Sequence, residues 1–142
     1  MSIAYFQLTQ VGEICYIKYI LKVNKHKYLI MHNPQPREIE FYTTQNGKTP
    51  FTEWFETLRD QKTRTRIRKR LQRLEEGNLG DCSSVGDGVY ELRLHFGPGI
   101  RVYFGIDSNR IVIILCGGDK TSQQRDINRA RTYWLEYKET QT

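Results

Sequence analysis

Two runs of alternating apolar and polar residues, joined by a glycine-rich turn, constrain the fold more than any other feature of the sequence. Residues 89–96 and 100–107 carry an apolar side chain at every second position, which is the period of a β-strand with one buried face. The Gly-Pro-Gly triplet at residues 97–99 interrupts the alternation and is typical of a turn. A third strand-like run follows at residues 110–116, after a Ser-Asn pair. These runs predict an antiparallel meander of three strands.

One strand and two helices are predicted ahead of the meander. Residues 38–43 alternate in polarity as a strand does. Thr49 is a good N-cap, Pro50 suits the first helical position, and the apolar residues that follow recur with helical spacing up to Leu58. Residues 59–76 form a second helical pattern, which a Gly-Asn pair ends.

A last helix is predicted over residues 122–138, where Ile127, Ala130 and Trp134 share an apolar side. The order of elements is therefore strand, two helices, three strands and a helix. This order suits an α+β fold, in which an antiparallel sheet of about four strands, with a mixed edge, is flanked by helices.

The polar residues of the first two meander strands form the first candidate site. Because successive side chains of a strand point to opposite faces, Glu91, Arg93 and His95 lie on the face opposite the apolar residues. Arg101 and Tyr103 join them if the hairpin registers its apolar faces together. Such a surface could bind a phosphodiester and stabilise the charge that builds up as it is attacked. A solvated outer face with cross-strand ion pairs has the same pattern, and spacing alone favours this second interpretation.

A basic helix face forms the second candidate site. Lys62, Arg66, Lys69 and Arg73 share one side of the helix at residues 59–76, and the whole chain holds 22 Lys and Arg against 16 Asp and Glu. The resulting net charge of +6 should attract polyanions, nucleic acid first among them. We interpret the face as a surface that binds the RNA backbone through its phosphates, although a solvated surface is the simpler alternative.

The segment that leads from the last strand into the last helix, residues 117–122, forms a third candidate site. Its glycines allow close approach of a ligand to the backbone, and Lys120 adds a positive charge. Thr121 and Gln124 are spaced as a capping box, and a helix start offers N–H groups to a phosphate. An ordinary strand-to-helix turn has the same composition, so this pattern is a weak signal.

Cysteine and histidine are too scattered to predict a metal site. The three cysteines form no CxxC pair, and the three histidines lie far apart. We therefore expect neither a metal nor another cofactor, and a reducing cytoplasm is the simplest interpretation of the odd number of cysteines. No stretch reaches the roughly 18 to 20 apolar residues that span a bilayer. No signal peptide is recognisable, so we expect a cytoplasmic protein that does not enter a membrane.

Residues 1–37 are an N-terminal extension whose structure the sequence does not predict, and residues 38–142 are the expected functional domain. Two interpretations of the extension stay open. Either it is an appendage with weak structure of its own, or translation starts at Met31 and the upstream segment is not part of the native protein.

Two motifs resemble a known family. They are VYELRLHFGPGIRVYF at residues 89–104 and GGDKTSQ at residues 117–123, the latter followed by Asp126-Ile127. They are similar to the addiction-module killer branch of the RelE/ParE toxins, close to HigB. The resemblance covers residues 39–137 and also takes in Pro50, Phe51 and the segment at residues 77–81.

The resemblance implies a compact fold with a central antiparallel sheet flanked by helices, and a co-expressed antitoxin that is a helix-turn-helix DNA-binding protein. RelE-like members are metal-independent endoribonucleases that cleave messenger RNA on the ribosome and inhibit translation. In them the 2′-hydroxyl attacks the adjacent phosphate. By position, Arg93, Arg101 and Lys120 match basic residues of the RelE active surface.

These matches lead to an expected division of roles. Arg101 and Lys120 would stabilise the pentavalent phosphate, Arg93 would orient it, and Glu91 or His95 would handle a proton. RelE also uses a tyrosine near its last helix, whereas here two glutamines and an arginine occupy residues 123–125. Tyr103 could substitute, but it lies on a different element.

Two competing functions stay open at this point. ParE-like members of the same fold inhibit DNA gyrase by binding it, without RNA chemistry. An inactive or purely RNA-binding relative would need the basic helix but not Arg101. The sequence does not identify the codons that would be cut, the dependence on the ribosome or the way an antitoxin docks.

Overall fold

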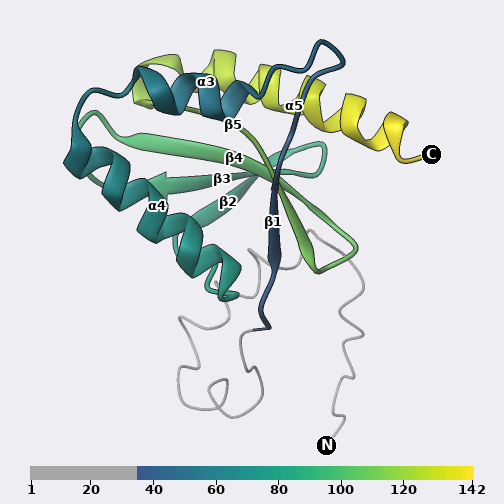
Figure 1. The fold of residues 1–142 in the computed structure, drawn as a ribbon, viewed down its shortest axis with the longest axis horizontal. Helices are drawn as coiled ribbons and strands as arrows, with labels where there is room; N and C mark the ends of the chain where they lie inside the picture. Colours follow the sequence, from purple (N-terminus) through teal and green to yellow (C-terminus); the bar gives the residue numbers. More distant parts are fainter. Residues whose placement is uncertain (1–34) are drawn as a thin grey trace, which may run out of the picture. The chain divides into compact units, whose positions relative to one another are not determined.

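A mixed sheet of five strands forms the centre of the fold (Figure 1). The computed structural model describes residues 35–142, so both interpretations of the N-terminal extension concern a segment that lies largely outside the described residues. The strands are β1 (Glu38–Phe41), β2 (Cys82–Gly86), β3 (Val89–Leu94), β4 (Ile100–Asp107) and β5 (Ile111–Gly118), and they lie in the order β1-β5-β4-β3-β2. The predicted α+β class is confirmed.

The predicted meander is confirmed, and β1 supplies the mixed edge. Strands β3, β4 and β5 pair antiparallel, whereas β1 runs parallel to β5. The expectation of about four strands was one too low, because β2 was not recognised. Its sequence, CSSVG, lacks a run of apolar or β-branched residues, and only Cys82 in it is buried. Backbone pairing with β3 therefore defines this edge strand more than its own side chains do.

Three helices surround the sheet: α3 (Pro50–Thr57), α4 (Gln61–Glu75) and α5 (Gln123–Thr140). Asp60 caps α4 by accepting hydrogen bonds from the backbone N–H groups of Lys62 and Thr63. Beyond the last turn of α4, Gly77 adopts φ +89°, a left-handed conformation that glycine tolerates. The stop predicted at this position is confirmed.

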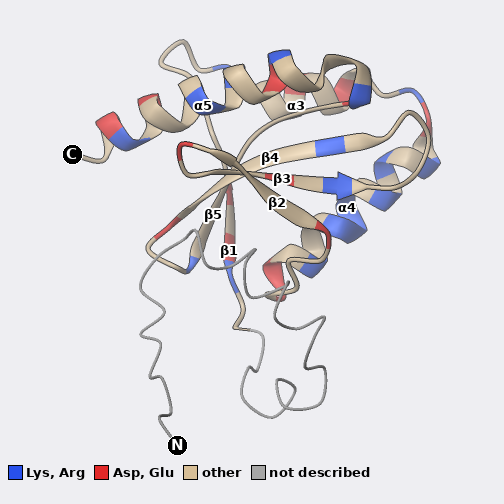
Figure 2. Ribbon diagram, turned by 180° about the vertical axis from the view of Figure 1, so that it is seen from behind, with Lys and Arg blue, Asp and Glu red and all other residues tan. Residues whose placement is uncertain are grey.

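The two faces of the sheet are covered by different helices. Helix α5 contributes Ile127, Ala130 and Trp134 to a core that also contains Val89 and Tyr103 of the sheet. On the other face, the indole ring of Trp54 in α3 lies directly over Gly117. Helix α4 lies on this same side: α3 and α4 are in front in Figure 1, whereas in Figure 2, seen from behind, α5 lies in front of α3.

Gly105 makes room for the largest side chain of α5. It belongs to β4, and a methyl group at this position would come within 2.4 Å of the Trp134 ring. The residue therefore lets α5 approach the sheet closely, because interiors are packed without spare volume.

We expect the change Gly105→Ala to lower the free energy of unfolding by about 1–3 kcal/mol, the usual cost of overpacking a core. In a Trp134→Leu background the same change should cost less, since the ring that it meets is gone. Urea unfolding of the four proteins measures both values. Leu135→Ala, at a position 54% exposed, is the control and should shift stability by no more than about 0.5 kcal/mol. An equal cost in both backgrounds would contradict this account.

Candidate functional site

The register of the β3–β4 hairpin brings the predicted polar residues together. Arg93 pairs directly with Arg101, and Glu91 pairs directly with Tyr103. Directly opposed residues of an antiparallel pair point to the same face of the sheet. This is the face that α5 covers, because Tyr103 belongs to the core beneath that helix.

The Glu91 carboxylate is the centre of the cluster, and its side chain is fully buried. It accepts hydrogen bonds from Arg93 Nε at 2.8 Å, the Gln123 side-chain amide at 2.8 Å and the Tyr103 hydroxyl at 3.2 Å. Arg101 Nε lies 3.5 Å from the same carboxylate and completes an ion pair. The interpretation as a solvated outer face is therefore wrong at the centre of this surface.

Glu91 stays ionised in spite of its burial. Removal from water by itself raises the pKa of a carboxyl group, but here the hydrogen bonds from Arg93, Gln123 and Tyr103 outweigh it. The result is a pKa below the ordinary value for glutamate. A buried carboxylate that is ionised and fully surrounded by donors is a poor acceptor for a further proton.

Each of the two arginines is fixed by hydrogen bonds from some of its nitrogen atoms, while part of its side chain stays exposed to solvent. Arg93 uses Nε for Glu91 and Nη2 for a hydrogen bond of 2.9 Å to Ser83, and 40% of its side chain is exposed. Arg101 uses Nη1 for a hydrogen bond of 2.8 Å to the carbonyl oxygen of Gly99, and 13% of its side chain is exposed. Both guanidinium groups thus have a fixed direction and a face that a ligand can reach.

Lys120 joins Arg101 at the turn between β3 and β4. A methyl group at Gly99 would lie 3.1 Å from Arg101 Nη1 and 3.4 Å from Lys120 Cβ, so both side chains flank this one residue. Lys120 is exposed, and no acid of residues 35–142 pairs with its ammonium group. The structure therefore places Arg93, Arg101 and Lys120 at the same end of the sheet.

The helix start after Lys120 differs from the predicted phosphate cradle. Asp119, and not Thr121, is the capping residue: its carboxylate accepts from the backbone N–H groups of Thr121 and Ser122. A short 3-10 turn, η1 (Lys120–Ser122), precedes α5 for this reason. The backbone N–H groups of η1 already have acceptors in Pro98 and Asp119, so within η1 the Lys120 side chain is the group left to bind a phosphate.

The remaining candidates for proton transfer differ sharply in exposure. The Tyr103 hydroxyl is buried beside Glu91, and both its burial and the nearby carboxylate raise the pKa of Tyr103 well above its usual value. His95 follows β3 and is 74% exposed, with its Nε2 atom hydrogen-bonded to the Asp81 carboxylate. Of these two residues, only His95 can exchange a proton with a bound ligand.

Sequence reasoning did not identify three residues that build this site. Ser83 lies on the unrecognised strand β2, and Asp81 directly precedes that strand. Gln123 is the first residue of α5 and reaches Glu91 across 32 residues of chain. Alternation along β3 and β4 carries no information about these neighbours. Asp81 and Gln123 do lie in segments that carry the family resemblance, but the resemblance assigned them no role.

The four predicted members of the basic face of α4 are all exposed to solvent: Lys62, Arg66, Lys69 and Arg73. Figure 2 shows how much of this helix consists of Lys and Arg. Other arginines of the helix have structural roles. Arg64 donates to the carbonyl oxygens of Leu58 and Glu56, and Arg70 donates to those of Asn78 and Leu79. The basic helix thus contains both structural arginines and arginines that are accessible to a partner.

Arg66 connects this helix to the site on the strands. Its guanidinium lies 5.0 Å from the centre of the Phe96 ring, in the loop between β3 and β4. Phe96 is in turn followed by the turn that contacts Arg101 and Lys120. The arginines of the strands and the basic face of α4 therefore lie on opposite faces of the sheet but at the same end of it, where an extended polyanion could contact both.

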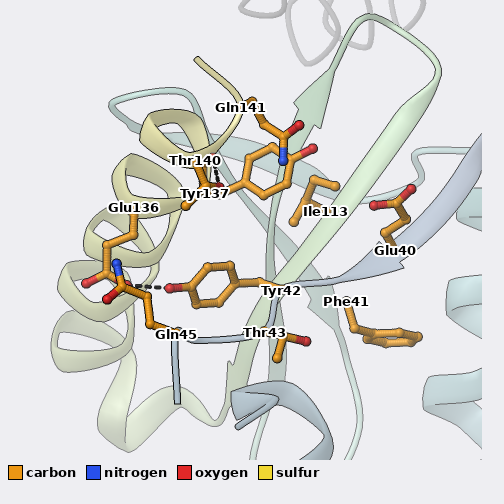
Figure 3. Close-up of a pocket in the computed structure, with 10 residues that line it drawn as sticks. All are labelled: Glu40, Phe41, Tyr42, Thr43, Gln45, Ile113, Glu136, Tyr137, Thr140 and Gln141. Atoms are coloured by element: carbon orange, nitrogen blue, oxygen red, sulfur yellow. Dashed lines mark hydrogen bonds between the residues drawn. The ribbon is translucent and has the colours of Figure 1, made fainter. Parts of the chain in front are cut away.

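A surface pocket between β1 and the end of α5 does not belong to this site (Figure 3). Its lining includes Glu40 and Glu136, and the Tyr42 hydroxyl donates a hydrogen bond to Glu136. None of the predicted site residues lines it. Two carboxylates and no basic side chain make it unsuited to a phosphate.

Two further observations concern the part of the chain that the structure describes. None of the helices in residues 35–142 is long and apolar enough to cross a membrane. Within the same residues, no three side chains of His, Cys, Asp or Glu come together as a metal-binding group.

Comparison with known proteins gives two matches. Residues 53–134 match the family described as phage-derived protein Gp49-like (DUF891). An uncharacterized protein of Haemophilus influenzae is 43% identical over 81 residues, which cover 57% of this chain and 82% of that protein. The family match runs from α3 to Trp134 in α5 and so contains every residue of the cluster around Glu91.

The ion pairs of Glu91 predict how stability depends on pH. A carboxyl group whose folded-state pKa is lowered stabilises the protein above its unfolded pKa, and this stabilisation is lost as pH falls through the folded value. We expect wild type to be more stable than Glu91→Gln near neutral pH, and the difference to shrink below the ordinary value of 4.5. Chemical unfolding at a series of pH values measures the difference. Glu139→Gln, an exposed control, should show no such dependence, and a difference that stays constant on acidification would contradict the assignment.

Proposed function

Since the chain belongs to the Gp49-like family of phage-derived proteins, a family of RelE-like toxins, we propose that it is the toxin of a type II toxin-antitoxin pair and cleaves messenger RNA. The observation that carries this proposal is the pairing of Arg93 with Arg101 around one buried carboxylate. Two guanidinium groups fixed side by side suit the oxygens of a phosphodiester. We assign residues 38–142 to the toxin domain and the motifs at residues 89–104 and 117–127 to the HigB-like branch.

The proposed reaction is an attack of the RNA 2′-hydroxyl on the adjacent phosphorus. The bond between the 2′-oxygen and phosphorus forms while the bond to the 5′-oxygen breaks, which leaves a cyclic phosphate and a free 5′-hydroxyl. Negative charge grows on the phosphate oxygens during this step. Arg101 and Lys120 both lie next to Gly99 and would stabilise that charge, and Arg93 would orient the phosphate. No metal ion is required in this scheme.

His95 is the proposed group for proton transfer. It is exposed at the end of β3, and the Asp81 carboxylate accepts a hydrogen bond from its ring. A carboxylate partner fixes the orientation of an imidazole and favours the form that accepts a proton on its other nitrogen. In this scheme His95 takes the proton of the 2′-hydroxyl, and solvent or the ribosome supplies a proton to the 5′-oxygen.

The exposed basic residues of α4 are the proposed binding surface for the rest of the RNA. Four cations on one helix face would neutralise backbone phosphates without reading sequence. We propose that the substrate is messenger RNA on the ribosome in the cytoplasm, and that a helix-turn-helix DNA-binding protein is the antitoxin. When the toxin is inactive, the antitoxin has to cover this exposed cationic surface or prevent it from reaching the ribosome.

Induced expression in a bacterial host tests the proposal directly. We expect wild type to create new 5′ ends inside translated messages within minutes, and Arg101→Ala to reduce them by about 10²–10³-fold, the cost of losing one donor to a developing anion. Arg110→Ala is the matched control, because this exposed arginine lies in the turn at the other end of β4. It should cleave like wild type.

Other outcomes of this experiment identify the competing functions. Growth arrest with intact messages and gyrase-dependent DNA breaks would contradict RNA cleavage and support a ParE-like inhibitor. Toxicity that survives Arg101→Ala but depends on α4 would indicate a protein that only binds RNA. Full cleavage by His95→Ala would exclude the proposed proton acceptor while leaving the role of Arg101 intact, since loss of a general base costs about 10²–10⁴-fold.

The salt dependence of binding tests the role of α4. In an Arg101→Ala background, which keeps the RNA uncut, the change of Lys69 and Arg73 to Ala removes two proposed phosphate contacts. The slope of log K against log salt should fall in magnitude by about 1.4, since each contact to a single strand contributes about 0.7. Anisotropy of a labelled RNA at several salt concentrations measures it. Changing Lys48 and Arg110 to Ala, both exposed elsewhere, should leave the slope unchanged.

A further inference from the structure

We propose that Glu91 is a positioning residue that aims Arg93 and Arg101 at the scissile phosphate, and that Gln123 at the start of α5 holds Glu91 in place. This inference deepens the proposed function and rests on it for the identity of the substrate. It changes the role expected for Glu91 from proton transfer to orientation. It also gives a role to Gln123, in the region where RelE has a catalytic tyrosine.

The partners of Glu91 leave it no capacity for proton transfer. Its two oxygens receive three hydrogen bonds, of which the one from Arg93 is also an ion pair, and a second ion pair from Arg101; these partners come from two strands and one helix. A carboxylate withdrawn from water costs several kcal/mol unless charged partners compensate it, and here two arginines do so. Protonation of Glu91 would break both ion pairs at once, which is why its pKa is lowered despite burial.

The same contacts determine which atoms of the arginines remain available. Arg93 uses Nε and Nη2 in hydrogen bonds, and Arg101 uses Nη1, while the buried Nε of Arg101 has only its ion-pair contact of 3.5 Å with Glu91. Within residues 35–142, Arg93 Nη1 and Arg101 Nη2 therefore have no hydrogen-bond partner. One terminal nitrogen on each guanidinium is left as a donor, and the two belong to directly paired residues. A free arginine would lose much rotational freedom on binding a phosphate, whereas these two have already lost it on folding.

Gln123 connects this arrangement to α5. Its side-chain amide donates to the Glu91 oxygen that also receives the Tyr103 hydroxyl and faces Arg101. The Asp119 cap fixes where the helix begins and so fixes the position of Gln123. The first residue of α5 thus supports the carboxylate from a third element, in addition to β3 and β4.

A kinetic cycle separates orientation from proton transfer. We expect Glu91→Gln to lower kcat for messenger cleavage by about 10²-fold, the effect of a misplaced catalytic group, with little change in KM because α4 binds the RNA. In a background with both Arg93→Ala and Arg101→Ala, Glu91→Gln should add almost nothing to the loss, since the residue acts through these two arginines. Gln123→Ala should show a smaller loss of the same kind. Glu139→Gln is the control and should cleave like wild type.

Two results would overturn the positioning role. A further large loss on adding Glu91→Gln to the variant that lacks both Arg93 and Arg101 would mean that Glu91 acts on the substrate independently of the two arginines. Loss of one limb of the pH–rate profile in Glu91→Gln would mean that it carries a proton. Melting curves of each variant identify losses that come from unfolding, and Gln123→Ala, which leaves the buried charge paired with both arginines, keeps the test available if Glu91→Gln does not fold.

A spectroscopic measurement keeps this inference separate from the proposed function. The Nε–H signals of Arg93 and Arg101 in ¹⁵N NMR spectra of the full chain should be sharp and protected from exchange in wild type. In Gln123→Ala both should move, and in Glu91→Gln both should exchange rapidly. Unchanged signals in Glu91→Gln would overturn the positioning role whatever the target of the protein. If wild type cleaves no message but the signals respond as expected, only the proposed function fails.

Discussion

The burial of one carboxylate is the constraint on which the rest of the site depends. Glu91 lies on a central strand beneath α5, where an ionised group is tolerated only if donors surround it. Those donors come from β3, β4 and the first residue of α5, so the charge is satisfied only when all three elements are in place. The tertiary arrangement and the direction of the arginines are therefore set by the same interaction.

Much of the fold could be predicted from periodicity alone. Alternation over β3 and β4 predicted the hairpin, and it predicted a shared polar face for Arg93 and Arg101 on the condition that the apolar faces register together; the observed register, with Arg93 opposite Arg101, meets this condition. Alternation separates the two faces of a strand but does not say what covers each face. The polar face was therefore expected to be solvated, whereas α5 buries Glu91 and Tyr103 completely. Strand β2 was missed for a related reason, because its backbone pairing with β3 defines it and its own side chains do not.

The number of basic residues on α4 predicted the charge of the helix but not the role of each arginine. Arg64 and Arg70 have the same chemistry as Arg66 and Arg73, yet the first two donate to carbonyl oxygens at the ends of neighbouring segments. Helical spacing did identify the exposed set, since four residues on one face can all reach solvent. An arginine elsewhere on a helix can donate to the backbone carbonyl oxygens of a neighbouring segment only where the tertiary fold brings that segment close to it. Helical spacing does not contain this information.

The division between buried and exposed groups also orders the proposed chemistry. Glu91 and Tyr103 lie in the interior, where their hydrogen bonds hold the cluster together and where no substrate can reach them. Arg93, Arg101, Lys120 and His95 lie at the rim of the same face, with polar atoms open to solvent. The buried residues that stabilise the cluster are thus close neighbours, on the same strands, of the residues that would contact the phosphate. The motif around residues 89–104 is compact for this reason, because a single hairpin supplies both the interior support and the surface that acts on the ligand.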